Sequence, residues 1–105
     1  MTTIRFHRVR GSVSGFTCEG HSGYAEAGED IVCAAISSSI RMLECTINDV
    51  MKAGAKCTVD EKTTRITLKL PSSPKKEAVD CMTGFWLSMK ELQKEYPEHL
   101  TVLEV

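Results

Sequence analysis

A histidine and a cysteine twelve residues apart could carry out nucleophilic chemistry in this chain. His21 follows Gly20 at the end of a predicted strand, and Cys33 lies in what is predicted as the first turn of a helix. Unpaired backbone N–H groups and the helix dipole favour negative charge there, so the thiol is a candidate for ionisation. The same N–H groups are candidates to hold an oxyanion. A histidine within reach of the thiol completes the minimum equipment for cysteine catalysis.

Two polar residues accompany this pair. Asp30 is predicted as the N-cap of the helix, and its carboxylate could instead orient His21 as the third member of a triad does. Ser37 follows Cys33 by four residues, so both side chains share one helix face. The Ser37 hydroxyl could bond the thiolate or the substrate, or the small side chain could simply permit close packing. The sequence leaves these alternatives open.

Metal binding is the alternative chemistry. Cys18 and His21 have a ligand-like Cys-x-x-His spacing, and Cys33 would be a third ligand. No fourth ligand is apparent, and in an alternating strand Cys18 and His21 would point to opposite faces. We therefore predict no metal and favour the nucleophilic reading.

Alternating apolar residues predict the strands, which cover residues 2–9, 13–19, 56–59, 65–70 and 99–105. Helical periodicity predicts two helices, over residues 30–53 and about 74–95. The core-facing stripe of the first helix consists of Ile36, Ile40, Leu43, Ile47 and Val50, and that of the second of Val79, Met82, Trp86, Met89 and Leu92 or Gln93. Ser73 is predicted to cap the second helix, with Pro74 at its first position.

The element order is therefore ββαββαβ. It predicts an α/β fold of the α+β type, with a mixed sheet and two helices packed on one face. Residues 20–29 form a loop between histidine and cysteine, with Gly20, Gly23 and Gly28 as points of backbone freedom. We expect its segment Ser22–Glu29 to act as a mobile lid over the site.

Composition limits the other possibilities. A chain of 105 residues forms one domain, residues 1–105. Its net charge of −1 gives no strong phosphate-binding field, so nucleic acid is not the expected partner. No apolar run approaches the ~20 residues of a membrane span, and the N-terminus lacks the features of a signal peptide.

The five cysteines indicate a reducing compartment, because their number is odd and none are in a Cys-x-x-Cys pair. We expect Cys33 to be the reactive thiol. The other four are expected to be structural, since a free cysteine usually behaves as a small buried hydrophobe. They are Cys18, Cys45, Cys57 and Cys81.

The sequence resembles the bacterial ribosomal-processing cysteine proteases of the Prp family. The motif consists of Gly20-His21, Gly28-x-Asp30-Ile31-Val32-Cys33-Ala34-Ala35 and Ser37. The resemblance implies a cytoplasmic cysteine endopeptidase that removes the N-terminal extension of large-subunit ribosomal protein number twenty-seven, cutting after a paired-aromatic segment.

The resemblance also implies the roles of individual residues. His21 and Cys33 would form the catalytic dyad, and Asp30 and Ser37 would belong to the same site. It further implies a homodimer that uses no cofactor. The alternative function is a non-catalytic, ribosome-associated protein-binding module that shares the fold and keeps a structural cysteine.

Overall fold

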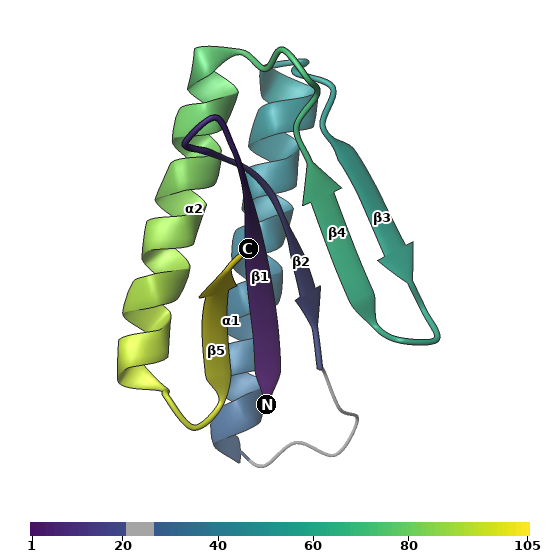
Figure 1. Cartoon of the computed structure of the whole chain (residues 1–105). Coiled ribbons are helices and arrows are strands. Elements are labelled where there is room, and N and C mark those ends of the chain that lie inside the picture. The colour runs from purple at the N-terminus through teal and green to yellow at the C-terminus, as the bar shows by residue number, and fades with distance from the viewer. Residues whose placement is uncertain (21–26) are drawn as a thin grey trace.

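The computed structural model describes residues 1–20 and 27–105, and its element order confirms the predicted ββαββαβ arrangement (Figure 1). The elements are β1 (Thr2–Val9), β2 (Ser12–Glu19), α1 (Ala27–Glu44), the π-helical turn η1 (Cys45–Val50), β3 (Lys56–Asp60), β4 (Arg65–Lys69), α2 (Lys76–Glu95) and β5 (Leu100–Glu104).

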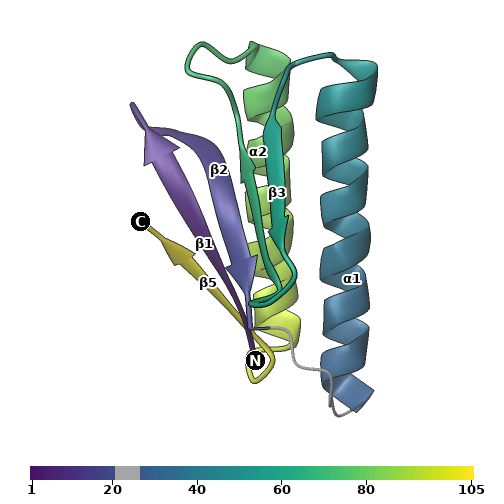
Figure 2. The same ribbon diagram turned by 90° about the vertical axis from the view of Figure 1, so that its right-hand side faces the viewer.

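The five strands form one mixed sheet in the order β3-β4-β2-β1-β5. The β1–β5 pair is parallel, and the other three pairs are antiparallel. Both helices lie on the same face of the sheet, as Figure 2 shows, so the predicted fold class is confirmed. Strand β1 alternates accordingly, with Thr2, Ile4 and Phe6 buried toward the helices.

Three aromatic rings join the sheet to α2 at the centre of the core. The Phe6 and Phe16 ring centroids are 5.8 Å apart, and Phe85 of α2 lies 5.8 Å from Phe6 and 4.8 Å from Phe16. Phe85 shifts the buried face of α2 from the predicted one. The buried residues of α2 are Ala78, Met82, Phe85 and Met89, whereas Val79, Trp86 and Leu92 are partly buried.

Helix α1 begins earlier than the capping pattern predicts. Ala27 is its first residue, so Asp30 is the fourth residue of the helix and the prediction that Asp30 is the N-cap is wrong. A good capping residue is only a local preference, and residues 27–29 continue the helix upstream of it. The predicted lid of Ser22–Glu29 is therefore wrong in its last three residues, including Gly28.

Helix α2 begins later than predicted. Its N-cap is Lys75, which has an extended backbone and no side-chain hydrogen bond to the helix. Ser73 and Pro74 consequently lie before the helix, and the predicted Ser73 cap is wrong. The C-terminal end agrees with the prediction, because Tyr96, the residue before Pro97, is the C-cap.

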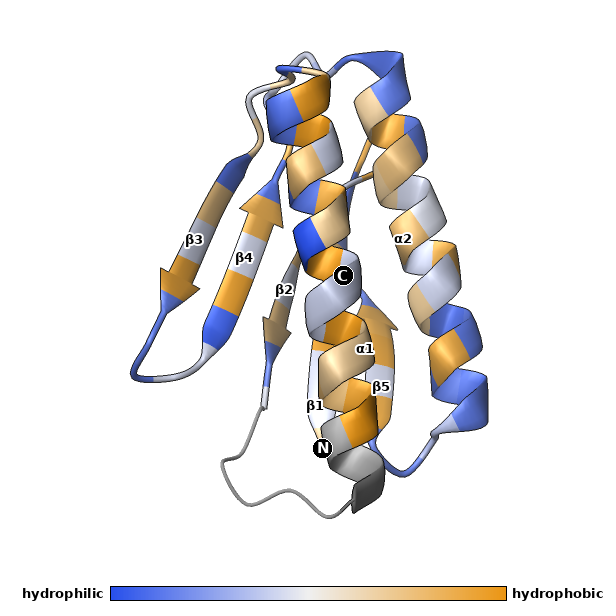
Figure 3. Ribbon diagram, turned by 180° about the vertical axis from the view of Figure 1, so that it is seen from behind, coloured by the Kyte–Doolittle hydropathy of each residue, from blue (hydrophilic) through white to orange (hydrophobic). Residues whose placement is uncertain are grey.

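The segment from α1 through η1 is unusually apolar. Ile31–Val50 is long and apolar enough, by length and composition, to cross a membrane, contrary to the sequence expectation. Four residues of its predicted stripe are buried in the core, as in a core helix of a globular domain: Ile36, Ile40, Leu43 and Ile47. The prediction was wrong for Val50, which is exposed. Figure 3 shows apolar residues along most of this helix, whereas α2 is hydrophilic near both ends. Cys45 is exposed, so its predicted structural role is wrong.

Candidate active site

One end of the sheet contains a pocket of about 340 Å³ that includes Cys33. At this end the start of β1, the end of β2, the first turns of α1 and the β3–β4 turn come together (Figure 1). The described residues that line the pocket are Thr2, Cys18, Glu19, Cys33, Ile36, Ser37, Ile40, Val59, Glu61, Thr64 and Ile66.

Cys33 and Ser37 lie on one wall of this pocket, as their spacing of four residues predicts. Cys33 is buried, with 8% of its surface exposed, and Ser37 one turn later is exposed. Four of the other nine described lining residues are aliphatic, namely Ile36, Ile40, Val59 and Ile66. The site therefore places a buried thiol and an exposed hydroxyl beside aliphatic side chains of the same pocket.

The prediction that unpaired N–H groups of the first helical turn favour ionisation of the Cys33 thiol is wrong, because Cys33 lies too far from the start of α1. Only the first four N–H groups of a helix lack partners within it. Cys33 is the seventh residue of α1, so its own N–H is not among them. At about 1.5 Å rise per residue, those first four groups lie roughly 4.5–9 Å before Cys33 along the axis. They are poorly placed to hold an oxyanion at the thiol.

Thr2 contacts the Cys33 thiol, although the sequence did not predict it as a site residue. Its Oγ1 lies 3.9 Å from the Cys33 Sγ, and either atom can be the donor. Thr2 is only 2% exposed. The two residues are 31 positions apart, and no local pattern in the sequence connects them.

Cys18 also lines the pocket, but its thiol is held in the protonated form. Burial is the main cause that raises the pKa of Cys18 to about 12, with further contributions from Cys33 and Glu19. Between the two cysteines of the pocket, Cys18 is therefore the poorer nucleophile, because the thiolate is the reactive species.

Metal binding finds no support among the described side chains, where no group of three His, Cys, Asp or Glu residues could hold an ion. His21 lies outside the described residues, so the particular set of Cys18, His21 and Cys33 stays untested.

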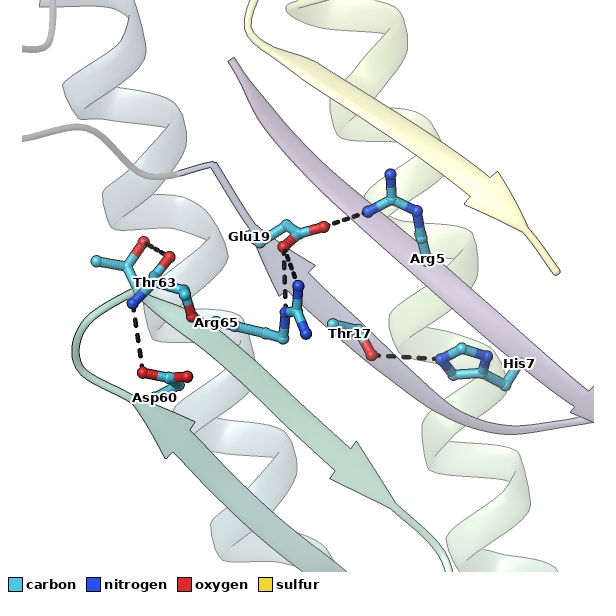
Figure 4. A network of polar contacts seen from close by, with 8 residues as sticks. Arg5, His7, Thr17, Glu19, Asp60, Thr63 and Arg65 are labelled. Atoms are coloured by element: carbon cyan, nitrogen blue, oxygen red, sulfur yellow. Dashed lines mark hydrogen bonds and ion pairs between the residues drawn. The ribbon is translucent and has the colours of Figure 1, made fainter.

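Glu19 fixes the end of β2 through two arginines on the outer face of the sheet (Figure 4). It accepts hydrogen bonds from Nε and Nη2 of Arg65, at 3.1 and 2.9 Å, and forms a second ion pair with Arg5. The Arg65 hydrogen bond is the largest of several causes that lower the pKa of Glu19. Three strands are thereby joined beside the pocket.

Gly20 directly follows the end of β2, in a conformation that suits glycine. Its φ is +97°, and a Cβ at this position would lie 2.4 Å from the Met1 carbonyl oxygen. Gly20 therefore lets the first residues of the chain pack against the end of β2. Of the other predicted site residues, His21 and Gly23 lie outside the described residues, and Asp30 and Gly28 belong to α1.

Comparisons with known proteins identify a matching family. The sequence model of the family described as cysteine protease Prp matches residues 1–101. No curated protein matches the chain.

Solved structures share the whole fold at low sequence identity. SMU.848 from Streptococcus mutans is 24% identical with a TM-score of 0.89, covering 100% of this chain and 97% of that chain. The ribosomal processing protease Prp from S. aureus in complex with a substrate peptide is 20% identical with a TM-score of 0.91, covering 100% of both chains. The same protease with a covalently linked product peptide is 21% identical, with a TM-score of 0.87 and 100% coverage of both chains.

Proposed function

Since the chain belongs to the cysteine protease Prp family and is a cysteine protease, we propose that it is an endopeptidase with Cys33 as nucleophile and His21 as general base and acid. The observation that carries this assignment is the pocket: it contains two cysteines, and Cys18 is held protonated. The family match favours this function over that of a non-catalytic binding module.

The reaction follows from thiol chemistry. His21 takes the proton of the Cys33 thiol, and the thiolate attacks the scissile carbonyl. His21 then protonates the leaving amine, which departs as the acyl group forms a thioester with Cys33. Water hydrolyses the thioester, so that the carboxylate product and the thiol are regenerated. Ser37 supports the thiolate or the substrate, and Asp30 orients His21.

The proposed substrate is the N-terminal extension of large-subunit ribosomal protein number twenty-seven, cut after a pair of aromatic residues. Two similar structures from S. aureus are of a ribosomal processing protease with substrate and product peptides, which supports a ribosomal protein as substrate. The four aliphatic side chains of the pocket suit an aromatic ring. The resemblance further supports a cytoplasmic homodimer that uses no cofactor.

Replacement of the nucleophile tests the assignment. We expect Cys33→Ala to abolish cleavage of the extended ribosomal protein, followed by mass spectrometry of the products, because the covalent route is lost. Cys81→Ala is the matched control, since this half-buried cysteine lies outside the pocket. Cleavage by Cys33→Ala at the rate of the control would refute the assignment. His21→Ala should bind the peptide but form the thioester very slowly.

Thiol labelling tests the same assignment without substrate. We expect iodoacetamide at neutral pH to modify Cys33 faster than Cys18 or Cys57, whose pKa values are raised to about 12 and about 11. Cys45 is exposed and serves as the reference thiol within the same molecule. Faster modification of Cys18 than of Cys33, mapped by peptide mass, would contradict the proposal.

Substrate substitutions test the recognition mode. We expect replacement of either aromatic residue by alanine to lower kcat/KM about 10- to 100-fold, as the loss of one buried ring predicts. Moderate salt should have a smaller effect, because the only charged residues among the described lining are Glu19, which is paired, and Glu61. A steep salt dependence with indifference to the aromatic pair would contradict this mode of recognition.

A further inference from the structure

We propose that Thr2 is a positioning residue, whose hydroxyl hydrogen-bonds the Cys33 sulfur and holds it ready for attack. This inference rests on the proposed function only in taking Cys33 as the nucleophile.

Thr2 is the one polar residue among the fully buried residues of the described chain, at 2% exposure. Burying a hydroxyl costs free energy unless the group is hydrogen-bonded. The contact that the structure gives this hydroxyl is the Cys33 Sγ at 3.9 Å, and Thr2 lines the same pocket as the thiol. The burial of Thr2 is therefore accounted for by its contact with the sulfur.

The backbone holds Thr2 from both sides. Its N–H donates to the His99 carbonyl oxygen at 2.9 Å, and it pairs with Leu100 of β5. On the other side the preceding residue packs against Gly20, where a Cβ would lie 2.4 Å from the Met1 carbonyl oxygen, so that only a residue without a side chain allows this approach. The β-branched side chain adds a stiff χ1 torsion. The position of the hydroxyl is thus set before substrate arrives.

Ionisation of the Cys33 thiol determines which of the two groups donates the hydrogen bond. In the neutral pair either group can donate, but a thiolate can only accept. When Cys33 loses its proton to the base, Thr2 must become the donor, and the hydrogen bond becomes charge-assisted. Such a bond favours the thiolate and restrains the sulfur on the pocket side of α1. The step needs no co-reactant beyond the base of the proposed mechanism.

Three variants separate this role from a structural one. Thr2→Val keeps the shape and removes the hydroxyl, whereas Thr2→Ser keeps the hydroxyl. Thr3→Val is the matched control, because it makes the same change at the next residue of β1, which points to the other side of the sheet. Urea unfolding verifies that each variant is folded.

The pH profile of Cys33 alkylation by iodoacetamide is the main readout, with Cys45 as the reference thiol in each sample. Among the described residues, the titratable groups that line the pocket with Cys33 are Cys18, Glu19 and Glu61, and none of the variants changes them. We expect Thr2→Val to move the profile to higher pH and to lower the rate at pH 7 about tenfold, as the loss of a hydrogen bond to a charged group predicts. Thr2→Ser and Thr3→Val should keep the wild-type profile.

Cleavage of the extended ribosomal protein is the second readout, and Thr2→Val should lower kcat more than it raises KM. An unchanged alkylation profile in Thr2→Val, or an equal shift in Thr2→Ser, would overturn the role of Thr2 while leaving the protease intact. Absence of cleavage by the wild type would overturn the proposed substrate, yet the alkylation profiles would still decide whether Thr2 acts on the sulfur. Should Thr2→Val not fold, a shifted profile in Thr2→Ser alone would overturn the role.

Discussion

A glycine lies at each end of the β1–β2 pair, Gly11 in the hairpin turn and Gly20 after β2, and the two glycines differ in their surroundings. In the hairpin turn Gly11 has a φ of +80°, and a Cβ there would meet nothing within 4 Å. At the pocket end Gly20 has a φ of +97°, and a Cβ there would collide with the Met1 carbonyl oxygen. The backbone conformation is similar at both positions, but only Gly20 is also confined by neighbouring chain.

This difference indicates which end of the β1–β2 pair tolerates substitutions without loss of activity. The hairpin end is a local turn, with Arg10 and Gly11 both at positive φ and the Arg8 guanidinium donating to the Gly11 carbonyl oxygen. The pocket end joins residues that are distant in sequence, so that Thr2, Gly20 and Cys33 must all fit at once. A small change at the pocket end should therefore affect both stability and chemistry, and the same change at the hairpin end should affect stability only.

The largest effect is expected for Gly20→Ala. The positive φ costs about 1–2 kcal/mol in any residue with a Cβ, and the collision with backbone adds to it, for a total loss of roughly 2–4 kcal/mol. The displaced start of β1 should also take Thr2 away from the thiol, so kcat/KM should fall. Urea unfolding and peptide cleavage measure the two effects.

Gly11→Ala is the counterpart at the other end. We expect a loss of about 1–2 kcal/mol in the free energy of unfolding, from the positive φ alone, and unchanged alkylation of Cys33. Equal losses in stability and activity for Gly11→Ala and Gly20→Ala would remove the distinction between the two ends.

Gly84 of α2 provides a third glycine that has neither constraint. It is exposed in the interior of the helix, and a Cβ there would meet nothing within 4 Å. Gly84→Ala should stabilise the protein by about 0.5–1 kcal/mol, because alanine loses less conformational freedom in a helix. Thermal unfolding measures this gain, and a loss of stability would show that α2 depends on a contact not apparent in the structure.

The smallest effect at neutral pH is expected for Glu19→Gln. Arg65 and Arg5 lower the pKa of the Glu19 carboxyl below its ordinary 4.5. Its contribution to stability is therefore present above that ordinary value and is lost as the pH falls through the lower value in the folded state. Urea unfolding should show a small destabilisation at pH 7 that disappears under acidic conditions. A difference that persists at low pH would indicate a packing role for Glu19.

Local patterns predicted the framework of the molecule well. The buried face of β1, of β4 and of the helix from Ile36 to Ile47 follows from the spacing of apolar residues within each segment. No information from other parts of the chain is needed to predict it. Capping at Asp30 and Ser73 was wrong, because a cap is a weak preference that neighbouring residues override. The buried face of α2 differs from the predicted one because Phe85 packs against Phe16, and such a tertiary contact cannot be predicted from the helix alone.

The candidate site was only half predictable for the same reason. Cys33 and Ser37 share a wall of the pocket through helix periodicity, which the sequence contains. Thr2 reaches the thiol because β1 lies beside both β2 and β5, and that arrangement depends on the whole sheet. The protonated state of Cys18 depends on burial in the assembled core, which no spacing reveals.

The parallel pairing of β1 with β5 has a consequence for the order of biosynthesis. Thr2 leaves the ribosome well before the residues that hold it on one side, which are His99 and strand β5. Until β5 emerges, β1 is an open edge strand, and its contact with Cys33 has support from β2 alone. We expect Thr2 to hold the Cys33 thiol in place only after β5 is synthesised. A partly translated chain should therefore have little protease activity toward neighbouring peptides.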